Sequence, residues 1–318
     1  MIGAIGLTLK AKPILNYLKE DLMAGVPMDQ REGWIWFDGK FVPWKDAKIH
    51  VLTHGLHYAS SVFEGERAYG GEIFKLREHT ERLIQSGKTL DFTIPYSADQ
   101  IDQACRDVLA KNGLVDGYIR PVAWRGSEEL SVPARNNTVH LAIAAWVWPS
   151  YFTIEERLKG IRLEWSKWKR PSPETIPSSA KAAGLYMICT LSKDAAMANG
   201  YADALMLDYR GYVAEATGAN VFFIKGKDIV TPTPDCFLNG ITRQTLIDLA
   251  RRNGYTVTER HMKPEELSNF DECFLTGTAA EVTPVSEIGE FRFKPAEACR
   301  TLIDAYTAEV QPKRVAAE

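Results

Sequence analysis

Short strand patterns and helix patterns alternate in both halves of this chain, which restricts it to folds that pack helices against sheets. In the first half, the apolar residues 34–37 lead into Asp38-Gly39, a pair that supplies the positive φ angles of a tight hairpin turn. The remaining elements predicted there are a second hairpin over 62–69 and 72–76, helices over 78–90 and 97–113, and strands over 118–124 and 138–147. Ser97 and Gln100 form a capping-box pattern at the start of the second helix. We therefore expect an α+β first half with antiparallel strands.

The second half repeats this mixture after a connection that begins at residues 148–151. It is predicted to contain strands at 161–165, 204–207, 212–215, 221–224, 229–230, 255–260 and 272–276, and helices at 181–199, 242–253 and 296–310. The expected organisation is an N-terminal extension over 1–30 with one helix near Pro13, a small α+β domain over 31–150, a connection over 151–160 and a large α/β domain over 161–318. Because ligand sites favour domain boundaries, we expect a cleft between the two domains.

Composition and missing motifs exclude several classes of protein. The 318 residues carry a net charge of −3, which argues against a general electrostatic grip on nucleic acid. The apolar run 141–148 is far shorter than the ~20 residues that a membrane span needs. The five cysteines form no Cys-x-x-Cys pair, as expected for reduced thiols in a cytoplasmic enzyme. The sequence contains no Rossmann, P-loop, zincin or nucleophile-elbow motif, and we expect no metal site.

Lys181 is surrounded by small and apolar residues, whereas most lysines of this chain lie among charges. Pro177-Ser178-Ser179-Ala180 precede it and Ala182-Ala183-Gly184-Leu185-Tyr186 follow. Small neighbours permit the close approach of a flat molecule, and desolvation would lower the amine pKa from its usual ~10.4 and favour Schiff-base chemistry. The alternative is an ordinary lysine at the start of a helix.

Three downstream segments could serve a charged ligand beside that lysine. Residues 238–243 lead a glycine loop into a helix that Thr242 could cap, and helix N-termini bind phosphate. The turn 276–281 has small residues whose N–H groups could bind a second anion. Glu215 ends an apolar strand and could pair with a pyridinium nitrogen. Each segment also has a purely structural interpretation, as a capped helix or a turn.

The order and spacing of these residues resemble a known family. The matching blocks are Leu56-His57-Tyr58, Val62-Phe63-Glu64-Gly65-Glu66-Arg67, Arg77-Glu78-His79, Tyr118-Ile119-Arg120-Pro121, Ala180-Lys181-Ala182, Glu215-Ala216-Thr217-Gly218-Ala219-Asn220, Gly240-Ile241-Thr242-Arg243 and Gly277-Thr278-Ala279-Ala280-Glu281. Together they span most of the chain past the lead-in. The sequence is similar to the fold-type IV aminotransferases, which use pyridoxal 5′-phosphate (PLP), and most resembles the branched-chain amino acid aminotransferases. The resemblance implies a two-domain fold of the D-amino acid aminotransferase type with the active site at the domain interface.

The resemblance also assigns roles to individual residues. Lys181 would bind PLP covalently, Glu215 would keep its ring nitrogen protonated, and Tyr186 would bind its phenolic oxygen. The phosphate would be bound by Arg77 and by the segments Gly240-Ile241-Thr242 and Gly277-Thr278. The substrate carboxylate would be bound by Tyr118 and the backbone of Thr278 and Ala279, with support from Arg120. The side-chain pocket would be formed by Tyr58, Phe63, Gly65, Trp148 and Tyr151.

Strand alternation supports part of this assignment. Phe63, Gly65 and Arg67 would share one face of a strand, and an apolar wall with one arginine suits both a leucine-like side chain and the second carboxylate of 2-oxoglutarate. Glu64 and Glu66 would face the other way. Relatives often carry an aliphatic residue at the position of Glu66, so this residue is a departure from the family pattern.

The implied activity is PLP-dependent transamination of branched-chain L-amino acids (leucine, isoleucine, valine) with 2-oxoglutarate. The expected partners are small amino acids and 2-oxo acids, with a cytoplasmic homodimer as the expected assembly by analogy. Alternatives within the fold are a D-amino acid or (R)-amine aminotransferase and an aminodeoxychorismate lyase. The alternative from another class is a non-catalytic binding protein in which Lys181 has no chemical role.

Overall fold

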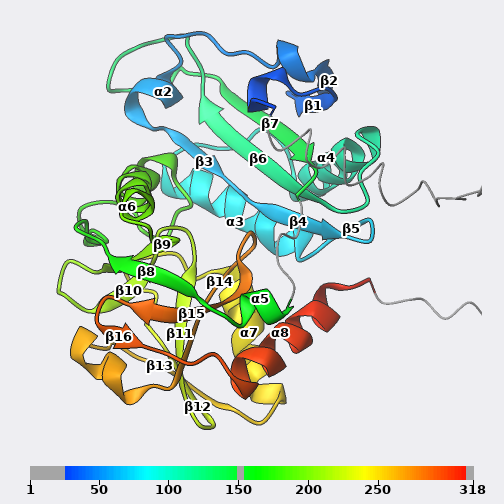
Figure 1. Cartoon of the computed structure of the whole chain (residues 1–318). Coiled ribbons are helices and arrows are strands. Elements are labelled where there is room, and N and C mark those ends of the chain that lie inside the picture. Colours follow the sequence, from blue (N-terminus) through cyan, green and yellow to red (C-terminus); the bar gives the residue numbers. More distant parts are fainter. Residues whose placement is uncertain (1–25, 149–153, 313–318) are drawn as a thin grey trace, which may run out of the picture.

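The computed structural model describes residues 26–148 and 154–312, which form two sheets stacked one above the other (Figure 1). The helix expected near Pro13 lies outside the described residues. None of the described helices is long and apolar enough to cross a membrane. The upper sheet is built from residues 34–146 and the lower sheet from residues 161–292, so each half of the chain makes its own sheet.

The upper sheet has seven strands in the order β2-β1-β7-β6-β4-β5, with β3 paired to β6. Its strands are β1 (Trp34–Phe37), β2 (Lys40–Pro43), β3 (Ser61–Phe63), β4 (Glu66–Tyr69), β5 (Glu72–Ile73), β6 (Gly117–Arg125) and β7 (Val139–Trp146). The β1–β2 hairpin is confirmed, with positive φ at Asp38 (46°) and Gly39 (87°). The second predicted hairpin is also confirmed, as the pair β4–β5, but its first strand is divided into β3 and β4.

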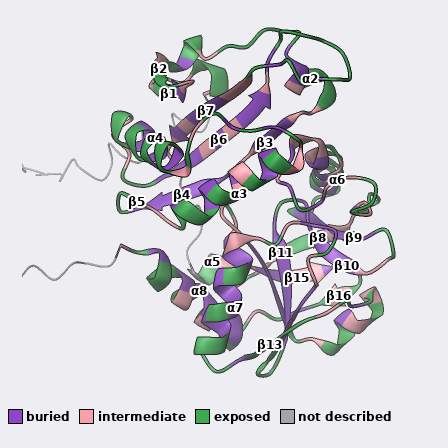
Figure 2. Cartoon of the chain, turned by 180° about the vertical axis from the view of Figure 1, so that it is seen from behind, coloured by how far each residue is buried: buried purple, intermediate pink, exposed green. Residues whose placement is uncertain are grey.

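Helices α3 (Leu76–Thr89) and α4 (Ala98–Lys111) pack against the upper sheet and share one apolar core with it. The capping box is confirmed, since Ser97 accepts from the Gln100 backbone and Gln100 accepts from the Ser97 backbone. The shorter helices of this half are η1 (Met28–Gln30), η2 (Trp44–Asp46) and α2 (His54–Tyr58). The strands are mostly buried while the outer sides of the helices are exposed (Figure 2).

The lower sheet has nine strands, mixes parallel and antiparallel pairs, and follows the order β10-β9-β8-β15-β14-β11-β12-β13, with β16 beside β15. Its strands are β8 (Ile161–Trp165), β9 (Asp203–Leu207), β10 (Val213–Ala216), β11 (Asn220–Lys225), β12 (Asp228–Thr231), β13 (Thr256–Glu259), β14 (Glu272–Gly277), β15 (Glu281–Ile288) and β16 (Phe291–Arg292). The helices of this half are α5 (Ile154–Arg157), η3 (Ala183–Tyr186), α6 (Met187–Ala198), α7 (Ile241–Arg252), η4 (Pro264–Asn269) and α8 (Glu297–Val310). Helices α7 and α8 share an apolar core with one face of the sheet.

The segment that carries Lys181 joins the two sheets. The helix predicted over 181–199 is found over 183–198, but Lys181 precedes it: the helical turns begin at Ala183, and Ala182 before them is extended. The Phe63 N–H donates to the Lys181 carbonyl (3.1 Å), the Lys181 N–H donates to Ser86 Oγ (3.0 Å), and Val62 pairs with Ala182. The lysine backbone is therefore held by the upper sheet and by α3, although it belongs to the second half of the chain.

A buried ion-pair cluster forms a second junction between the halves. Glu281, at the start of β15, accepts from Arg67 of β4 (2.9 Å), from Arg157 of α5 (2.6 Å) and from the Tyr69 hydroxyl (3.0 Å). Arg67 and Glu281 are both buried. Because buried charges are costly unless paired, this cluster fixes the distance between β4 and β15.

We expect Glu281→Gln to lower the free energy of unfolding by about 3 kcal/mol, since it leaves two arginines without their carboxylate. The matched control is Asp271→Asn, which removes the exposed pair with Lys225 (2.7 Å, both side chains 60% exposed) and should cost less than about 1 kcal/mol. Chemical denaturation of both variants measures the difference. Equal losses would show that the buried cluster does not hold the two halves together.

Candidate active site

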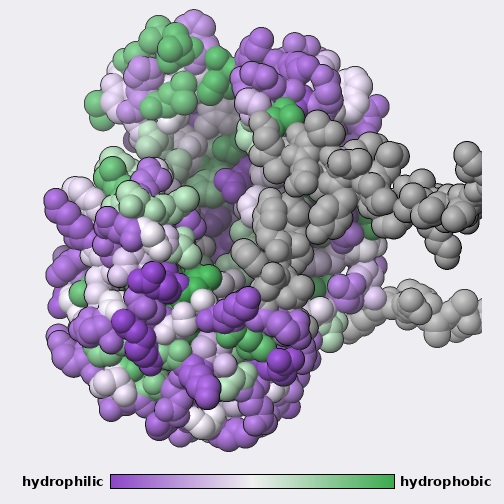
Figure 3. All heavy atoms as spheres, viewed as in Figure 1, coloured by the Kyte–Doolittle hydropathy of each residue, from purple (hydrophilic) through white to green (hydrophobic). Residues whose placement is uncertain are grey.

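A cavity of about 110 Å³ opens between the two sheets. The surface is hollowed between the upper and lower parts of the molecule (Figure 3). Most residues predicted for the site line this cavity: Gly65, Tyr118, Lys181, Tyr186, Glu215, Gly240, Ile241, Thr242, Gly277, Thr278 and Ala279. They come from both sheets and from the start of α7, so the fold brings together segments that are far apart in the sequence.

The Lys181 amine lies beside a tyrosine hydroxyl. Lys181 Nζ donates to Tyr186 Oη at 2.8 Å, and it lies 5.0 Å from the centre of the Phe63 ring. The Phe63 and Tyr186 rings meet edge to face, with their centres 4.8 Å apart. The amine therefore faces the cavity with one hydroxyl and two aromatic rings around it.

Glu215 lies on β10 and lines the same cavity. Arg170 Nε lies 3.4 Å from its carboxylate, and Asn220 Nδ2 donates to it at 3.1 Å. Burial raises the pKa of Glu215 to about 7, although Arg170, Lys181 and Arg243 oppose that rise. A carboxylate that is buried and incompletely paired suits a cationic ring nitrogen that would complete its charge balance.

The start of α7 forms an end of the cavity with free backbone donors. Helix α7 begins at Ile241, and Gly240 is its N-cap residue without a side-chain cap hydrogen bond. The prediction that Thr242 caps this helix is wrong, because Thr242 already lies in the first turn. Gly240 is required here, since a Cβ would lie 2.3 Å from Asn220 Oδ1, which accepts from the Gly240 N–H at 3.2 Å. The uncapped N–H groups and the helix dipole favour an anion.

The arginine of α3 at this cavity is Arg82, and Arg77, which was predicted there, lies outside the cavity lining. Arg77 is partly exposed and pairs with Asp99 and with Asp102 (2.9 Å) of α4. The two arginines are five positions apart, which corresponds to about 140° around a helix. Arg82 uses Nε and Nη2 to bind Glu64 (2.7 and 2.8 Å). Its Nη1 is buried and has no hydrogen-bond partner among the described residues.

Arg67 does not line the cavity either. Its guanidinium is committed to Glu281, so the predicted contact with a second substrate carboxylate lacks support in the structure. Arg120 also lies outside the cavity lining and lines the second, apolar pocket, but it contacts two residues beside the Lys181 amine and the cavity: its Nη2 donates to Tyr118 Oη (2.8 Å) and its Cζ lies 4.7 Å from the centre of the Phe63 ring. No acidic partner of Arg120 is found in residues 26–148 and 154–312.

Of the remaining residues predicted for the side-chain pocket, some lie beside the cavity and others lie away from it. Tyr118 packs beside Trp148, with ring centres 5.0 Å apart, and a Cβ at Gly65 would lie 1.9 Å from Tyr118 Oη. Gly65 is therefore needed for the tyrosine to reach the cavity. Tyr58 is 45% exposed and stacks on His54, away from the cavity lining. Tyr151 lies outside the described residues.

Three further residues at the site were missed from the sequence: Arg82, Arg170 and Asn220. His79 and Arg82 are three residues apart on α3 and both bind Glu64, at 2.7 Å for the histidine, so their spacing was an available signal for Arg82. Arg170 lies in an irregular segment and Asn220 begins β11, and no local pattern relates them to Glu215. Their roles depend on the tertiary arrangement.

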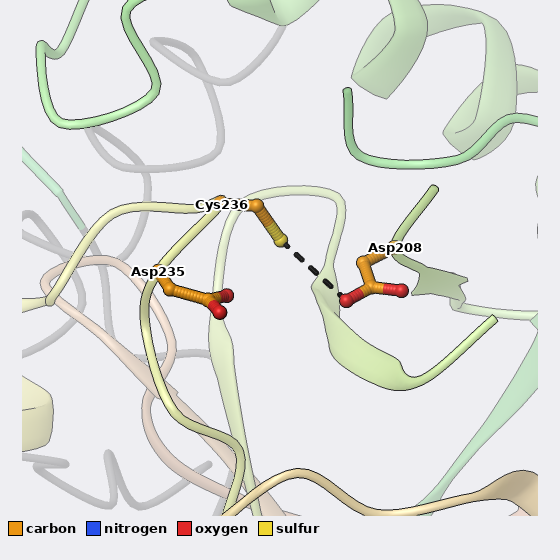
Figure 4. Close-up of side chains that lie close together, drawn as sticks. All are labelled: Asp208, Asp235 and Cys236. Carbon is orange, nitrogen blue, oxygen red and sulfur yellow. Dashed lines mark hydrogen bonds between the residues drawn. The ribbon is translucent and has the colours of Figure 1, made fainter. Parts of the chain in front are cut away.

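A group of possible metal ligands lies elsewhere: Asp208, Asp235 and Cys236 (Figure 4). Arg210 already occupies the space between the acids, donating to Asp208 (2.6 Å) and to both oxygens of Asp235 (2.9 Å). Burial, followed by the two acids, raises the pKa of the Cys236 thiol to about 12, so the thiol keeps its proton. This arrangement is an ion-pair cluster with poor metal-binding properties.

Comparisons with known proteins agree with this geometry. The chain is 46% identical over 266 residues to a probable branched-chain-amino-acid aminotransferase of Rickettsia felis (84% of this chain, 90% of the relative). It is 43% identical over 265 residues to the branched-chain-amino-acid aminotransferase of Pseudomonas aeruginosa (82% and 86%). The crystal structure of the T.th. branched-chain amino acid aminotransferase with pyridoxamine 5′-phosphate superposes with a TM-score of 0.86 at 39% identity (90% and 96%).

That T.th. enzyme has also been solved with N-(5′-phosphopyridoxyl)-L-glutamate and with 4-methylvaleric acid. The family model for class IV aminotransferases matches residues 61–288, which include both sheets' contributions to the cavity and the whole Lys181 segment. This chain belongs to the class IV aminotransferase family.

Proposed function

We propose that this chain is a PLP-dependent branched-chain amino acid aminotransferase that uses 2-oxoglutarate as the amino acceptor. The observation that carries the proposal is one cavity that holds the Lys181 amine against Tyr186, the buried Glu215 and the N-terminus of α7. The relatives named branched-chain aminotransferases and the T.th. complexes support both the cofactor and the substrates.

The residues of the cavity fit each functional group of PLP. The amine suits the aldehyde, the Tyr186 hydroxyl suits the phenolic oxygen, and Glu215 suits the ring nitrogen. The α7 N-terminus, the turn at Thr278 and the unpartnered Nη1 of Arg82 suit the phosphate. When bound, PLP supplies an electron sink that stabilises negative charge at the substrate Cα.

The protein's own residues supply proton transfer and orientation. Lys181 Nζ is the base that would take the proton from the substrate Cα and the acid that would deliver it to the cofactor C4′. Tyr186, at 2.8 Å, orients that amine. Because the pKa of Glu215 is raised to about 7 by burial, a cationic ring nitrogen beside it would favour its ionised form at neutral pH.

The substrate side of the cavity suits two kinds of side chain. Phe63, Tyr118 and Trp148 offer an aromatic wall for a branched aliphatic group. Arg120 offers a cation for the second carboxylate of 2-oxoglutarate, held at the wall by its bond to Tyr118 Oη. This arrangement explains how one pocket accepts leucine and glutamate in turn.

We expect Lys181→Ala to lose multiple turnover with L-leucine and 2-oxoglutarate even when PLP is added, because no other amine replaces the base. Borohydride reduction of the wild-type protein with PLP, followed by peptide mapping, should place the label on Lys181. Full turnover by the variant, or a label at another residue, would contradict the proposal.

The same assay separates the alternatives within the fold. The wild-type protein should prefer L-leucine, L-isoleucine and L-valine over D-alanine and (R)-amines. A preference for D-alanine would favour a D-amino acid aminotransferase, and pyruvate release from aminodeoxychorismate would favour a lyase. A protein that neither binds PLP nor turns over any of these substrates would be a binding protein.

Arg82 and Arg77 form a matched pair for testing which arginine binds the PLP phosphate. We expect Arg82→Lys to weaken PLP binding about tenfold, because an ammonium group cannot bind Glu64 in bidentate fashion and still present a free N–H to the phosphate. Arg77→Lys should leave PLP affinity unchanged, since Arg77 does not line the cavity. Titration of the PLP-free protein measures both. A larger loss from Arg77→Lys would make Arg77 the phosphate ligand instead.

The assembly that we propose is a cytoplasmic homodimer formed through the upper sheet. Exposed apolar side chains gather around α2 (Figure 3), namely Ile49, Val51, Leu52, Leu56 and Tyr58. They adjoin a mainly apolar cavity of about 340 Å³ lined by Ile35, Phe37, Leu56 and Trp124, with Arg120 as its charged residue. An exposed patch of this kind is typical of a subunit interface. All five cysteines are free and buried, as suits a reducing compartment.

We expect the wild-type protein to sediment as a dimer and Leu56→Asp to sediment as a monomer, because a charge in the centre of the patch prevents its burial. Val115→Asp is the matched control: Val115 is also exposed (59%) but lies outside the patch, so it should leave the dimer intact. A monomeric wild-type protein would exclude this assembly.

A further inference from the structure

Glu66 is a fully buried carboxyl group to which the proposed mechanism gives no role. It lies on β4 with 0% exposure, and its side chain faces α3 and α4, on the opposite side of the strand from the cavity. Neither carboxyl oxygen makes a hydrogen bond of ordinary geometry within the described parts of the chain, and the interacting donor is the Cys105 thiol, a weak one. A buried polar group without partners is rare and costly, so its state requires an explanation.

The cations near Glu66 are already paired with other acids. Arg82 binds Glu64 through two nitrogens, and His79 binds the same carboxylate at 2.7 Å. Arg77 binds Asp102 at 2.9 Å. Glu64 and Asp102 thus use the charges that α3 supplies, and ionised Glu66 would add an unbalanced negative charge to a buried cluster.

Most of the influences on Glu66 from the elements packed against it raise its pKa. Burial raises the pKa of Glu66 well above its usual range, and Glu64 and Asp102 raise it further. The Cys105 thiol of α4 and Arg82 of α3 act in the opposite sense but do not overcome that rise. On β6, its pairing partner is the uncharged Ile119. Glu64 is equally buried, yet Arg82 and His79 hold its pKa well below the usual range.

The part of the active site proposed to bind the phosphate also depends on Arg82. Glu64 holds Arg82 at the cavity, and the unpartnered Nη1 of Arg82 is the donor that suits the phosphate. A negative charge on Glu66 would compete with Glu64 for the guanidinium and lower the positive potential at the cavity.

We propose that Glu66 is a positioning residue that acts through Arg82: it remains a neutral carboxylic acid at neutral pH and thereby leaves the guanidinium free for Glu64 and the cofactor phosphate. This inference rests on the proposed function, because the anion is the phosphate of PLP.

The test compares PLP affinity of the wild-type protein and of Glu66→Gln between pH 6 and pH 9.5. The titrations of PLP itself, Lys181 and Glu215 cancel in the ratio of the two dissociation constants, because both proteins share them. We expect a ratio near one at pH 6 and a ratio that rises toward the alkaline end, by up to about tenfold, because higher pH favours the ionised form of Glu66 in the wild-type protein alone. A ratio that is constant across this range would overturn the inference.

A second variant and a second measurement keep the test decisive if Glu66→Gln does not fold. Glu66→Met also removes the titrating group, and its PLP affinity should follow the pH dependence of Glu66→Gln. Because Glu66 binds its proton more tightly in the folded chain than in the unfolded chain, wild-type stability should fall relative to both variants as pH rises above the ordinary carboxyl pKa. Melting temperatures that keep a fixed offset between pH 5 and pH 9 would contradict a protonated Glu66.

The two proposals fail in different ways. If the wild-type protein binds no PLP at any pH, the proposed function fails. If it binds PLP but the ratio to Glu66→Gln is flat, only the role of Glu66 fails.

Discussion

The backbone pairing of Lys181 with β3 is the constraint on which the site depends. This pairing attaches the second half of the chain to the first at the residue that carries the amine. Ala180, Ala182 and Leu185 belong to the apolar core of the upper sheet, so the amine is placed by the packing of a domain from which its own sequence segment does not come. Conversely, Tyr69 belongs to β4 of the upper sheet but packs in the apolar core of the lower sheet. The cavity is therefore held from both sides by exchanged segments.

Charge balance decides which arginines are available for ligand binding. Glu281 takes Arg67 and Arg157, Asp102 takes Arg77, and Glu64 takes two of the donor atoms of Arg82. Buried carboxylates need these partners because an unpaired charge in the interior is costly. Among the described residues, these ion pairs leave Nη1 of Arg82 in the cavity and Nε of Arg120, behind Tyr118, without a hydrogen-bond partner. The ligand-binding charges are thus those that the structural ion pairs do not use.

Several parts of the fold could be predicted from local patterns alone. The Asp38-Gly39 hairpin, the Ser97 capping box and strand β8 depend on turn chemistry and side-chain periodicity, which act between close neighbours in the sequence. The local pattern located the start of α7 but suggested Thr242 as its cap, whereas the N-cap residue is Gly240. The sequence could not distinguish Arg77 from Arg82 as the cavity residue, because both lie on one helix. The packing of α3 against the upper sheet decides which side of that helix faces the cavity.

The sequence by itself determined the alternation of elements, the unusual neighbours of Lys181 and the set of anion-binding loops, since these depend on residues close in the chain. Only the tertiary structure decided that Arg67 belongs to Glu281, that Asn220 connects Glu215 to the start of α7, and that Glu66 is left without a counter-charge. These pairings join residues from different helices and strands. Their energies depend on distance and burial, which no local pattern specifies.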